Sequence, residues 1–121
     1  MYDLNTGLNK PLYMQIADQT VKMVSEGKLR EGDKMPSVRE LAADLGINPA
    51  TVSKAYKTLD ERGFIKTEKG LGTYISYSQK SIDNQQKKAA ENLRKAAENA
   101  RDMNIGYEEA EKIIKDIYGE V

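Results

Sequence analysis

Two helix-start signals that lie close together constrain the fold of this chain most. Ser37 is followed three residues later by Glu40, the pattern of a capping box, in which each side chain accepts a hydrogen bond from the other residue's backbone N–H. Gly46 can adopt the left-handed backbone conformation at a helix end. Asn48 and Pro49 form the second signal, because asparagine is a good N-cap and proline suits the first helical position. The sequence therefore predicts two short helices joined by a tight turn.

Apolar residues at three- and four-residue steps support these two helices and predict another helix before them. Residues 11–26 carry such a stripe, with Pro11 at the first helical position and Gly27 at the end. Residues 28–36 are expected to form an irregular connection that carries Leu29 inward.

Gly63 ends the predicted helix that starts at Asn48. The segment after Gly63 decides between two possible folds. Two short helices joined by a tight turn fit both a helix-turn-helix and an ordinary helical hairpin. Residues 64–68 and 73–77 are rich in β-branched and aromatic side chains, and they flank a loop with two glycines at 69–72. This pattern predicts a β-hairpin. A hairpin directly after a helix-turn-helix is a winged helix, so we expect a mostly α fold with a small β-hairpin.

Residues 79–121 have a different character. Apolar and small residues over 82–103 follow alternating steps of four and three, the heptad pattern of a helix that packs along one stripe. Residues 104–106 interrupt it, and a second stripe over 107–121 includes Val121. The alanine-rich stripe is too thin for a core of its own, so we expect it to pack on a second copy of the chain or, alternatively, on the chain's own first helix. The predicted dimerisation residues are Ile82, Ala89, Leu93, Ala96, Ala100, Met103, Tyr107, Ile114 and Ile117.

The composition excludes several classes of function. The chain has no Cys and no His, which excludes disulfides, thiolate nucleophiles, Cys/His zinc sites and imidazole catalysis. Its acidic residues lie mostly at polar helix positions, and no metal loop or phosphate cradle is present. No run approaches the roughly 20 apolar residues of a membrane span, and the N-terminus lacks the pattern of a signal peptide. We therefore expect a cytoplasmic protein that is not an enzyme and has no cofactor, metal or membrane partner.

Placement of charge, rather than net charge, indicates the partner. Basic and acidic residues balance at 19 each, but residues 48–57 contain Lys54 and Lys57 and no acid. A helix start also offers free backbone N–H groups and the positive end of the helix dipole, both suited to phosphate. Arg39 is expected on the exposed side of the preceding helix, where it either binds phosphate or guanine or pairs locally with Asp44. The predicted helix that starts at Asn48 presents hydroxyl, methyl and ammonium groups on its outer face. These groups suit phosphates and base edges and come from Pro49, Ala50, Thr51, Ser53, Lys54 and Lys57.

The first two thirds of the chain contain five different sequence motifs, and their order and spacing are typical of one known domain. The first lies at the start of the first predicted helix, the next two on the helix pair, and the last two on the predicted hairpin. In chain order they are Pro11-Leu12-Tyr13 with Gln15-Ile16, Met35-Pro36-Ser37-Val38-Arg39-Glu40-Leu41-Ala42, Gly46-Ile47-Asn48-Pro49-Ala50-Thr51-Val52-Ser53-Lys54-Ala55-Tyr56 with Leu59, Gly63-Phe64-Ile65, and Gly70-Leu71-Gly72-Thr73-Tyr74-Ile75.

Together these motifs resemble the N-terminal domain of the GntR family of bacterial transcription regulators. The short tail is similar to that of the YtrA-like subfamily, in which it serves dimerisation. The resemblance implies a repressor that binds DNA and controls an operon, often one that encodes an ABC transporter. It also implies DNA contacts from Arg39 on the second helix, from Thr51 and Ser53 on the recognition helix, and from Lys69 with Gly70 at the wing tip.

These expectations combine into a homodimeric winged-helix repressor, with a DNA-binding domain over 1–78 and a two-helix dimerisation segment over 79–121. Two-fold symmetry implies an inverted-repeat operator in double-stranded DNA, with half-sites about 10 bp or a multiple of that apart. The rival hypothesis is a winged helix used for protein contact and assembly, without specific DNA binding. No residue set identifies a small-molecule effector. The candidate DNA-binding residues are Ser37, Arg39, Asn48, Pro49, Ala50, Thr51, Ser53, Lys54, Lys57, Lys69, Gly70, Gly72 and Thr73.

Overall fold

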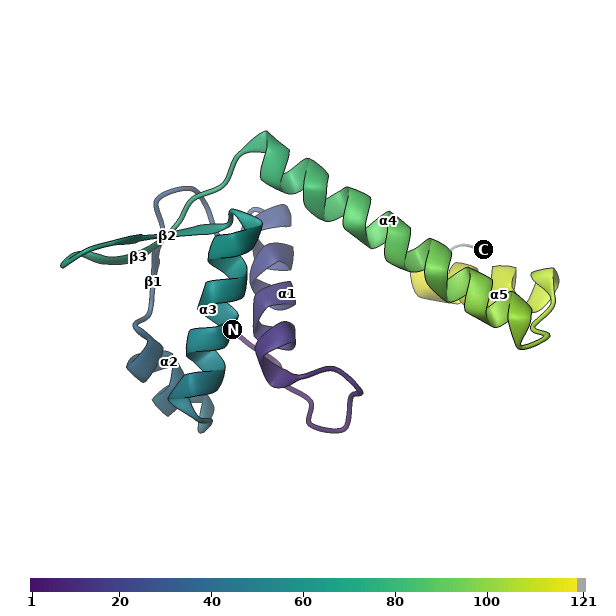
Figure 1. Ribbon diagram of the computed structural model, residues 1–121, viewed down its shortest axis with the longest axis horizontal. Coiled ribbons are helices and arrows are strands. Elements are labelled where there is room, and N and C mark those ends of the chain that lie inside the picture. The colour runs from purple at the N-terminus through teal and green to yellow at the C-terminus, as the bar shows by residue number, and fades with distance from the viewer. Residues whose placement is uncertain (120–121) are drawn as a thin grey trace. The chain divides into compact units, whose positions relative to one another are not determined.

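The computed structural model of the chain describes residues 1–119 (Figure 1). Val121, which belongs to the second predicted apolar stripe, lies outside the described residues. The chain divides into two compact units, one over residues 1–82 and one that begins at residue 83. The assignment of DNA binding to residues 1–78 and of dimerisation to residues 79–121 remains a prediction.

The first unit contains three helices and a small antiparallel sheet, which confirms the predicted fold class. The sheet has the strand order β1-β3-β2. The second unit consists of the greater part of a long helix and a shorter helix after it. In chain order the elements are α1 (Leu12–Ser25), β1 (Lys34–Met35), α2 (Val38–Leu45), α3 (Pro49–Arg62), β2 (Ile65–Glu68), β3 (Gly72–Ile75), α4 (Gln79–Asp102) and α5 (Tyr107–Tyr118).

The ends of α2 and α3 form as their sequences predict. The Glu40 backbone N–H donates to Ser37 Oγ at 3.1 Å and the Ser37 N–H donates to Glu40 Oε1 at 3.2 Å, which completes the capping box. Gly46 and Gly63 take left-handed conformations, with φ of 66° and 81°, and end α2 and α3. Asn48 caps α3 through its side chain, which accepts a hydrogen bond from the Ala50 N–H at 2.8 Å.

Two details at other element boundaries differ from the sequence prediction. Pro11 is the N-cap of α1, with an extended ψ of 148°, rather than its first helical residue. The connection predicted as irregular over 28–36 contains the strand β1, which pairs with β3 through Lys34 opposite Tyr74 and Met35 opposite Thr73. Two residues are too few to show the alternation of polar and apolar side chains that marks a strand. The neighbouring strand imposes the pairing of β1.

The core of the first unit lies where α1, α2, α3 and the sheet meet. Phe64, Ile16, Leu59, Ile75 and Val52 are almost completely buried there. Each such side chain contributes on the order of 1.5–3 kcal/mol through removal of apolar surface from water. The predicted apolar faces of the three helices all point into this core, and Leu29 packs against it in half-buried form. Burial of these faces fixes which faces of α2 and α3 remain exposed.

The first residues of an N-terminal arm, residues 1–10, are held against α1 by side-chain amides, and a turn follows at residues 6–7. The Gln19 side chain accepts from the Asp3 N–H at 2.8 Å and donates to the Asp3 carbonyl at 2.6 Å. The buried Gln15 side chain bonds the Asn5 N–H and carbonyl in the same way, each at 2.9 Å. Tyr2 adds a hydroxyl–hydroxyl bond to Thr20 at 2.7 Å. The two glutamines therefore pair with the arm as a neighbouring strand would.

An ion pair ties the C-terminal end of α3 to the middle of α1. Arg62 Nη1 lies 2.8 Å from Asp18 Oδ1, and Lys10 Nζ lies 2.8 Å from the other carboxylate oxygen. The Arg62 side chain is only 15% exposed. Burial raises the pKa of the Asp18 carboxyl, but hydrogen bonds from Arg62 and Lys10 lower it more, so the net pKa lies below its ordinary value.

We expect Asp18→Asn to lower the free energy of unfolding by about 1–2 kcal/mol, between the effects of breaking exposed and buried ion pairs. The stabilisation by Asp18 is present above the pKa of the carboxyl in the unfolded chain and is lost as pH falls through its lowered pKa in the folded chain. Urea unfolding at neutral and acidic pH measures both effects. The difference between the variant and the unmodified chain should shrink in acid, and a constant difference would contradict the assignment. Lys10→Ala, which removes the more exposed partner, is the control and should cost less.

Candidate nucleic-acid interface

One face of α3 is exposed along the whole first half of the helix. Ala50, Ser53, Lys54 and Lys57 lie on it at three- and four-residue steps and are exposed, opposite the buried face of Val52, Ala55, Tyr56 and Leu59. Thr51 is half-buried beside this face. The sequence placed these side chains on the outer face, and the structure exposes them together.

The start of α3 offers fewer free donors than the sequence suggested. Pro49 has no N–H, the Ala50 N–H bonds the Asn48 side chain, and the Thr51 N–H donates to the Asn48 carbonyl at 3.0 Å. The prediction of free backbone N–H groups at this helix start is therefore wrong. The reason is that the capping residue and the following turn already satisfy them. The positive end of the helix dipole and the two lysines remain to attract an anion.

Arg39 projects from the first turn of α2. Its side chain is exposed and makes no ion pair within residues 1–119, so the expected alternative of a local pair with Asp44 is not formed. Ser37, by contrast, is engaged in the capping box. Ser37 thus positions α2, while Arg39 is available to a partner.

A buried hydroxyl joins the start of α2 to α3. Tyr56, on the buried face of α3, donates its O–H to the Pro36 carbonyl at 2.7 Å. Burial, with a smaller contribution from nearby Tyr2 and Glu40, raises the pKa of Tyr56 far above its ordinary value, so the hydroxyl keeps its proton and remains a donor. The bond holds the segment that carries Arg39 against the helix that carries Lys54 and Lys57.

The wing is the hairpin formed by β2, β3 and the loop between them. Lys69 and Gly70 lie exposed in this loop, and Gly70 and Gly72 adopt φ of 83° and 117°, which favour glycine. The Thr73 hydroxyl is half-buried and lies 3.3 Å from the hydroxyl of Thr67 across the hairpin, so it is engaged within the sheet. Lys69 and the glycine backbone at the wing tip are therefore accessible to a ligand.

Lys34 joins the wing although the sequence did not indicate it. It lies on β1, opposite Tyr74 of β3, and its stem covers Gly72, where an added Cβ would stand 3.0 Å from Lys34 Cε. Its ammonium makes no ion pair with the described residues. Periodicity could not have found this residue, because its place depends on the pairing of β1 with β3.

The structure brings α2, α3 and the wing together around one side of the first unit. Figure 1 shows α2 and the sheet on the same side of α3, with α1 on the other. The pairing of Met35 with Thr73 and the bond from Tyr56 to Pro36 link the three parts directly. Exposed basic side chains that form no ion pair with a described residue lie on each of these parts: Arg39 on α2, Lys54 and Lys57 on α3, and Lys34 and Lys69 at the wing. Such a surface can bind an extended anion.

A shallow groove runs between the start of α1 and the outer face of α3. Tyr13 of α1 and Lys54 of α3 border it, and the Lys54 Nζ lies 4.2 Å from the centroid of the Tyr13 ring. The other residues along the groove are Pro11, Leu12, Ala50, Thr51, Ser53, Lys57, Thr58 and Glu61.

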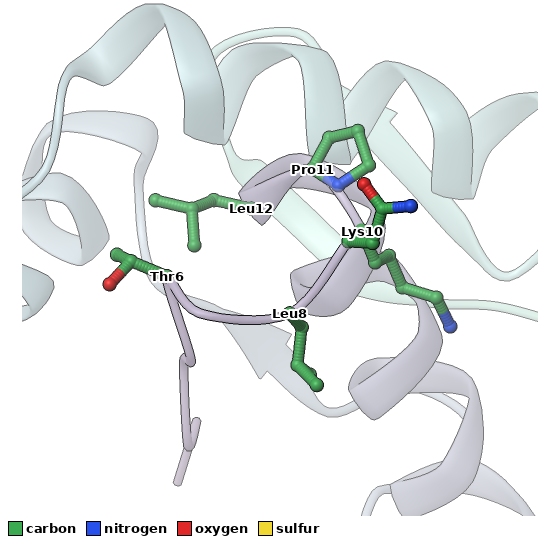
Figure 2. A pocket seen from close by; sticks show the side chains of 6 residues that line it. Thr6, Leu8, Lys10, Pro11 and Leu12 are labelled. Atoms are coloured by element: carbon green, nitrogen blue, oxygen red, sulfur yellow. The ribbon is translucent and has the colours of Figure 1, made fainter.

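A second hollow next to this groove has no unpaired basic side chain that could bind an anion. Lys10, its one charged side chain, pairs with Asp18. Figure 2 shows the side chains around this hollow, which come from a single stretch of chain: Thr6, Leu8, Asn9, Lys10, Pro11 and Leu12.

The predicted dimerisation residues are mostly exposed. Leu93, Tyr107 and Ile117 are 49%, 77% and 76% exposed, and Met103 and Ile114 are exposed as well. Ala89 and Ala96 are exposed, and Ala100 is half-buried. Ile82 differs, because it packs half-buried against the core of the first unit. The sequence analysis did not include Ile113 and Tyr118, two further exposed apolar side chains of α5.

The described part of the chain offers neither of two other kinds of site. No helix there combines the length and apolar character that crossing a membrane requires. No group of three or more acidic side chains there could hold a metal ion.

Comparison with known proteins identifies relatives of both the first unit and the whole chain. The sequence model of the family described as "Bacterial regulatory proteins, gntR family" matches residues 12–75. The HTH-type transcriptional repressor YtrA of Bacillus subtilis (strain 168) is 37% identical over 123 aligned residues, which cover 100% of this chain and 95% of YtrA.

Solved structures give the same result for the fold. A GntR family transcriptional regulator from Listeria monocytogenes superposes with a TM-score of 0.72 and 30% identity, over 93% of this chain and 98% of that one. The DNA-binding domain of AraR in complex with operator ORE1 superposes with a TM-score of 0.53 and 25% identity, over 63% of this chain and 93% of that one. The part of this chain with a DNA-bound structural relative is thus about the size of its winged helix.

Proposed function

Because the chain belongs to the GntR family of bacterial regulatory proteins, we propose that it represses transcription by binding an inverted-repeat DNA operator as a homodimer. Membership in this family already makes the chain a transcription regulator and not an enzyme. The operator, the dimer and the repressor role are the proposed part.

The exposed basic side chains of α2, α3 and the wing, which form no ion pair with a described residue, carry the proposal. In the proposed complex the first half of α3 enters the major groove, and the wing lies along the neighbouring backbone or minor groove. Lys57 and Lys69 contact phosphates, which supply affinity without sequence preference. Arg39 reaches a base edge or phosphate from α2, because it is exposed and lacks an acidic partner among the described residues.

Sequence preference is assigned to the small side chains at the start of α3. The Ser53 and Thr51 hydroxyls can donate to or accept from base edges, and the Ala50 and Pro49 methylene or methyl groups can contact a thymine methyl. Lysines contribute little to discrimination, because an ammonium has no fixed bonding direction. Arg39 is the residue of the set best suited to read guanine, through its two parallel donors.

The second unit supports a homodimer. Its exposed stripe includes Leu93 on α4 and Tyr107, Ile114 and Ile117 on α5, too much apolar surface for helices that are otherwise polar. A second copy supplies an identical stripe, and two-fold symmetry then matches an inverted repeat. The repressor role is supported by the name of the YtrA relative, which is 37% identical over the whole chain. Control of a transporter operon rests on the resemblance to the YtrA-like subfamily alone.

Selection from a random pool of duplexes tests the proposed function directly. We expect the full chain to enrich an inverted repeat with half-site centres about 10 bp or a multiple of that apart. Sequencing of the selected pool measures this. A pool that stays random would contradict sequence-specific DNA binding and favour the rival role of a protein-interaction module.

Substitutions at Asn48 separate stability from binding. Asn48→Ala removes the α3 cap and should cost about 1 kcal/mol of unfolding free energy, whereas Asn48→Asp keeps a capping oxygen and should cost only a few tenths. On the enriched duplex the order should reverse, because the new carboxylate faces phosphates and weakens binding by about tenfold or more. Thermal melting and titration measure the two effects. Asn99→Asp, the same charge change on α4, should leave both unchanged, and undiminished binding by Asn48→Asp would place the DNA elsewhere.

The dimer is tested by a charge placed in the exposed stripe. We expect the chain to be a dimer in light scattering at micromolar concentration and Ile117→Arg to be a monomer, because a buried unpaired charge opposes association. Loss of the second half-site contact should then weaken operator binding by about a hundredfold. Asp116→Arg places the same charge one residue away, off the stripe, and should remain a dimer. Dimerisation of both variants would exclude this face.

A further inference from the structure

Tyr13 and Lys54 form a contact that joins the start of α1 to the outer face of α3. The Lys54 ammonium lies over the face of the Tyr13 ring, 4.2 Å from its centroid, the geometry of a cation–π interaction. The two residues lie far apart in the sequence, so the packing of α1 on α3 brings them together. Within the described residues, the Lys54 side chain makes no ion pair or hydrogen bond that would compete with this contact.

The ring is a fixed platform rather than a mobile partner. Tyr13 is half-buried and packs against the apolar core, next to the fully buried Ile16 and Ala17 of the same helix. Its contacts with the core restrict the orientations open to the ring, because core side chains are closely packed. Lys54, in contrast, is exposed and has a flexible four-carbon stem. The ring therefore limits where the ammonium can be.

The contact holds Lys54 without neutralising it. A carboxylate would cancel the charge, as Asp18 does for Arg62 at the other end of α3, 2.8 Å away. An aromatic ring attracts a cation through its quadrupole and leaves the full charge in place. Along its own helix Lys54 has Ala50 and Thr58 at four residues and Lys57 at three, so no acid lies within reach there.

The space in front of the held ammonium is open and bordered by small side chains. Ala50, Thr51 and Ser53 line the groove beside it, so nothing bulky prevents close approach of a chain of phosphates. The acid in this groove, Glu61, lies seven residues further along α3. A cationic ligand would find no negative charge at Lys54. A phosphodiester, in contrast, can pair with the positive ammonium, and the open groove lets it approach.

We propose that Tyr13 is a positioning residue for DNA binding: its ring holds the Lys54 ammonium at the edge of the α3 face, aimed at a backbone phosphate beside the groove that α3 enters. The assignment rests on the proposed function, whose docked face lies next to this contact. An ammonium that is already placed loses less side-chain freedom when it meets the phosphate, so the ring contributes affinity without touching DNA.

A double-mutant cycle on the full chain with the enriched duplex tests this assignment. We expect Tyr13→Leu to weaken binding by about threefold to tenfold, from the lost ring contact and the freed lysine. Tyr13→Phe, which keeps the ring and removes the hydroxyl, should bind as the unmodified chain does. In a Lys54→Ala background, Tyr13→Leu should have no further effect. In a Lys57→Ala background, the matched control on the same helix face, it should keep its full effect.

Each alternative gives a different result. Equal effects of Tyr13→Leu with and without Lys54 would overturn the positioning role, as would a Tyr13→Phe variant as weak as Tyr13→Leu. An unmodified chain that binds no duplex would instead overturn the proposed function. If Tyr13→Leu melts early, proton NMR of the folded chain decides. The Lys54 ε-methylene protons should be shifted upfield by the ring in the unmodified chain and in Tyr13→Phe, and an unshifted signal overturns the assignment.

Discussion

Burial of one face of α3 is the constraint on which the rest of the first unit depends. Val52, Ala55 and Leu59 are fully buried, and α1, α2 and the sheet meet around them. Because a helix turns once in 3.6 residues, burial of these positions forces Ala50, Ser53, Lys54 and Lys57 to the opposite side. The same packing neutralises the charge at one end of α3, because Arg62 pairs with Asp18 of α1, whereas Lys54 and Lys57 form no ion pair with any residue of 1–119. The core thus fixes the face that we propose binds DNA.

Local chemistry explains why so much of the fold could be predicted from the sequence. Capping, left-handed glycines and proline at a helix start act within four residues of each other, so α2 and α3 were predicted with their ends. The resemblance to the GntR family and its YtrA-like subfamily is confirmed by the family match and by a relative that aligns with the whole chain. β1 was missed, because two residues become a strand only when β3 lies beside them.

The candidate site also contains residues that local sequence patterns predict and residues that only contacts between distant segments reveal. Residues on one helix face, such as Ser53 and Lys57, follow from periodicity and were placed correctly on the outside. Lys34 over Gly72 and Tyr13 under Lys54 depend on contacts between distant segments, and no local pattern indicates them. The N–H groups expected to be free at the start of α3 are bonded to the capping residue Asn48, which the sequence analysis had already identified. Asn48 is a good cap because it satisfies one of those donors itself.

The N-terminal arm shows how a segment can be held with few demands on its own side chains. Gln15 and Gln19 bond the main-chain groups of Asn5 and Asp3, which every residue except proline possesses. A substitution at position 3 that keeps the backbone N–H therefore preserves both hydrogen bonds to Gln19. At these two positions the path of the arm is thus specified by side chains that belong to α1.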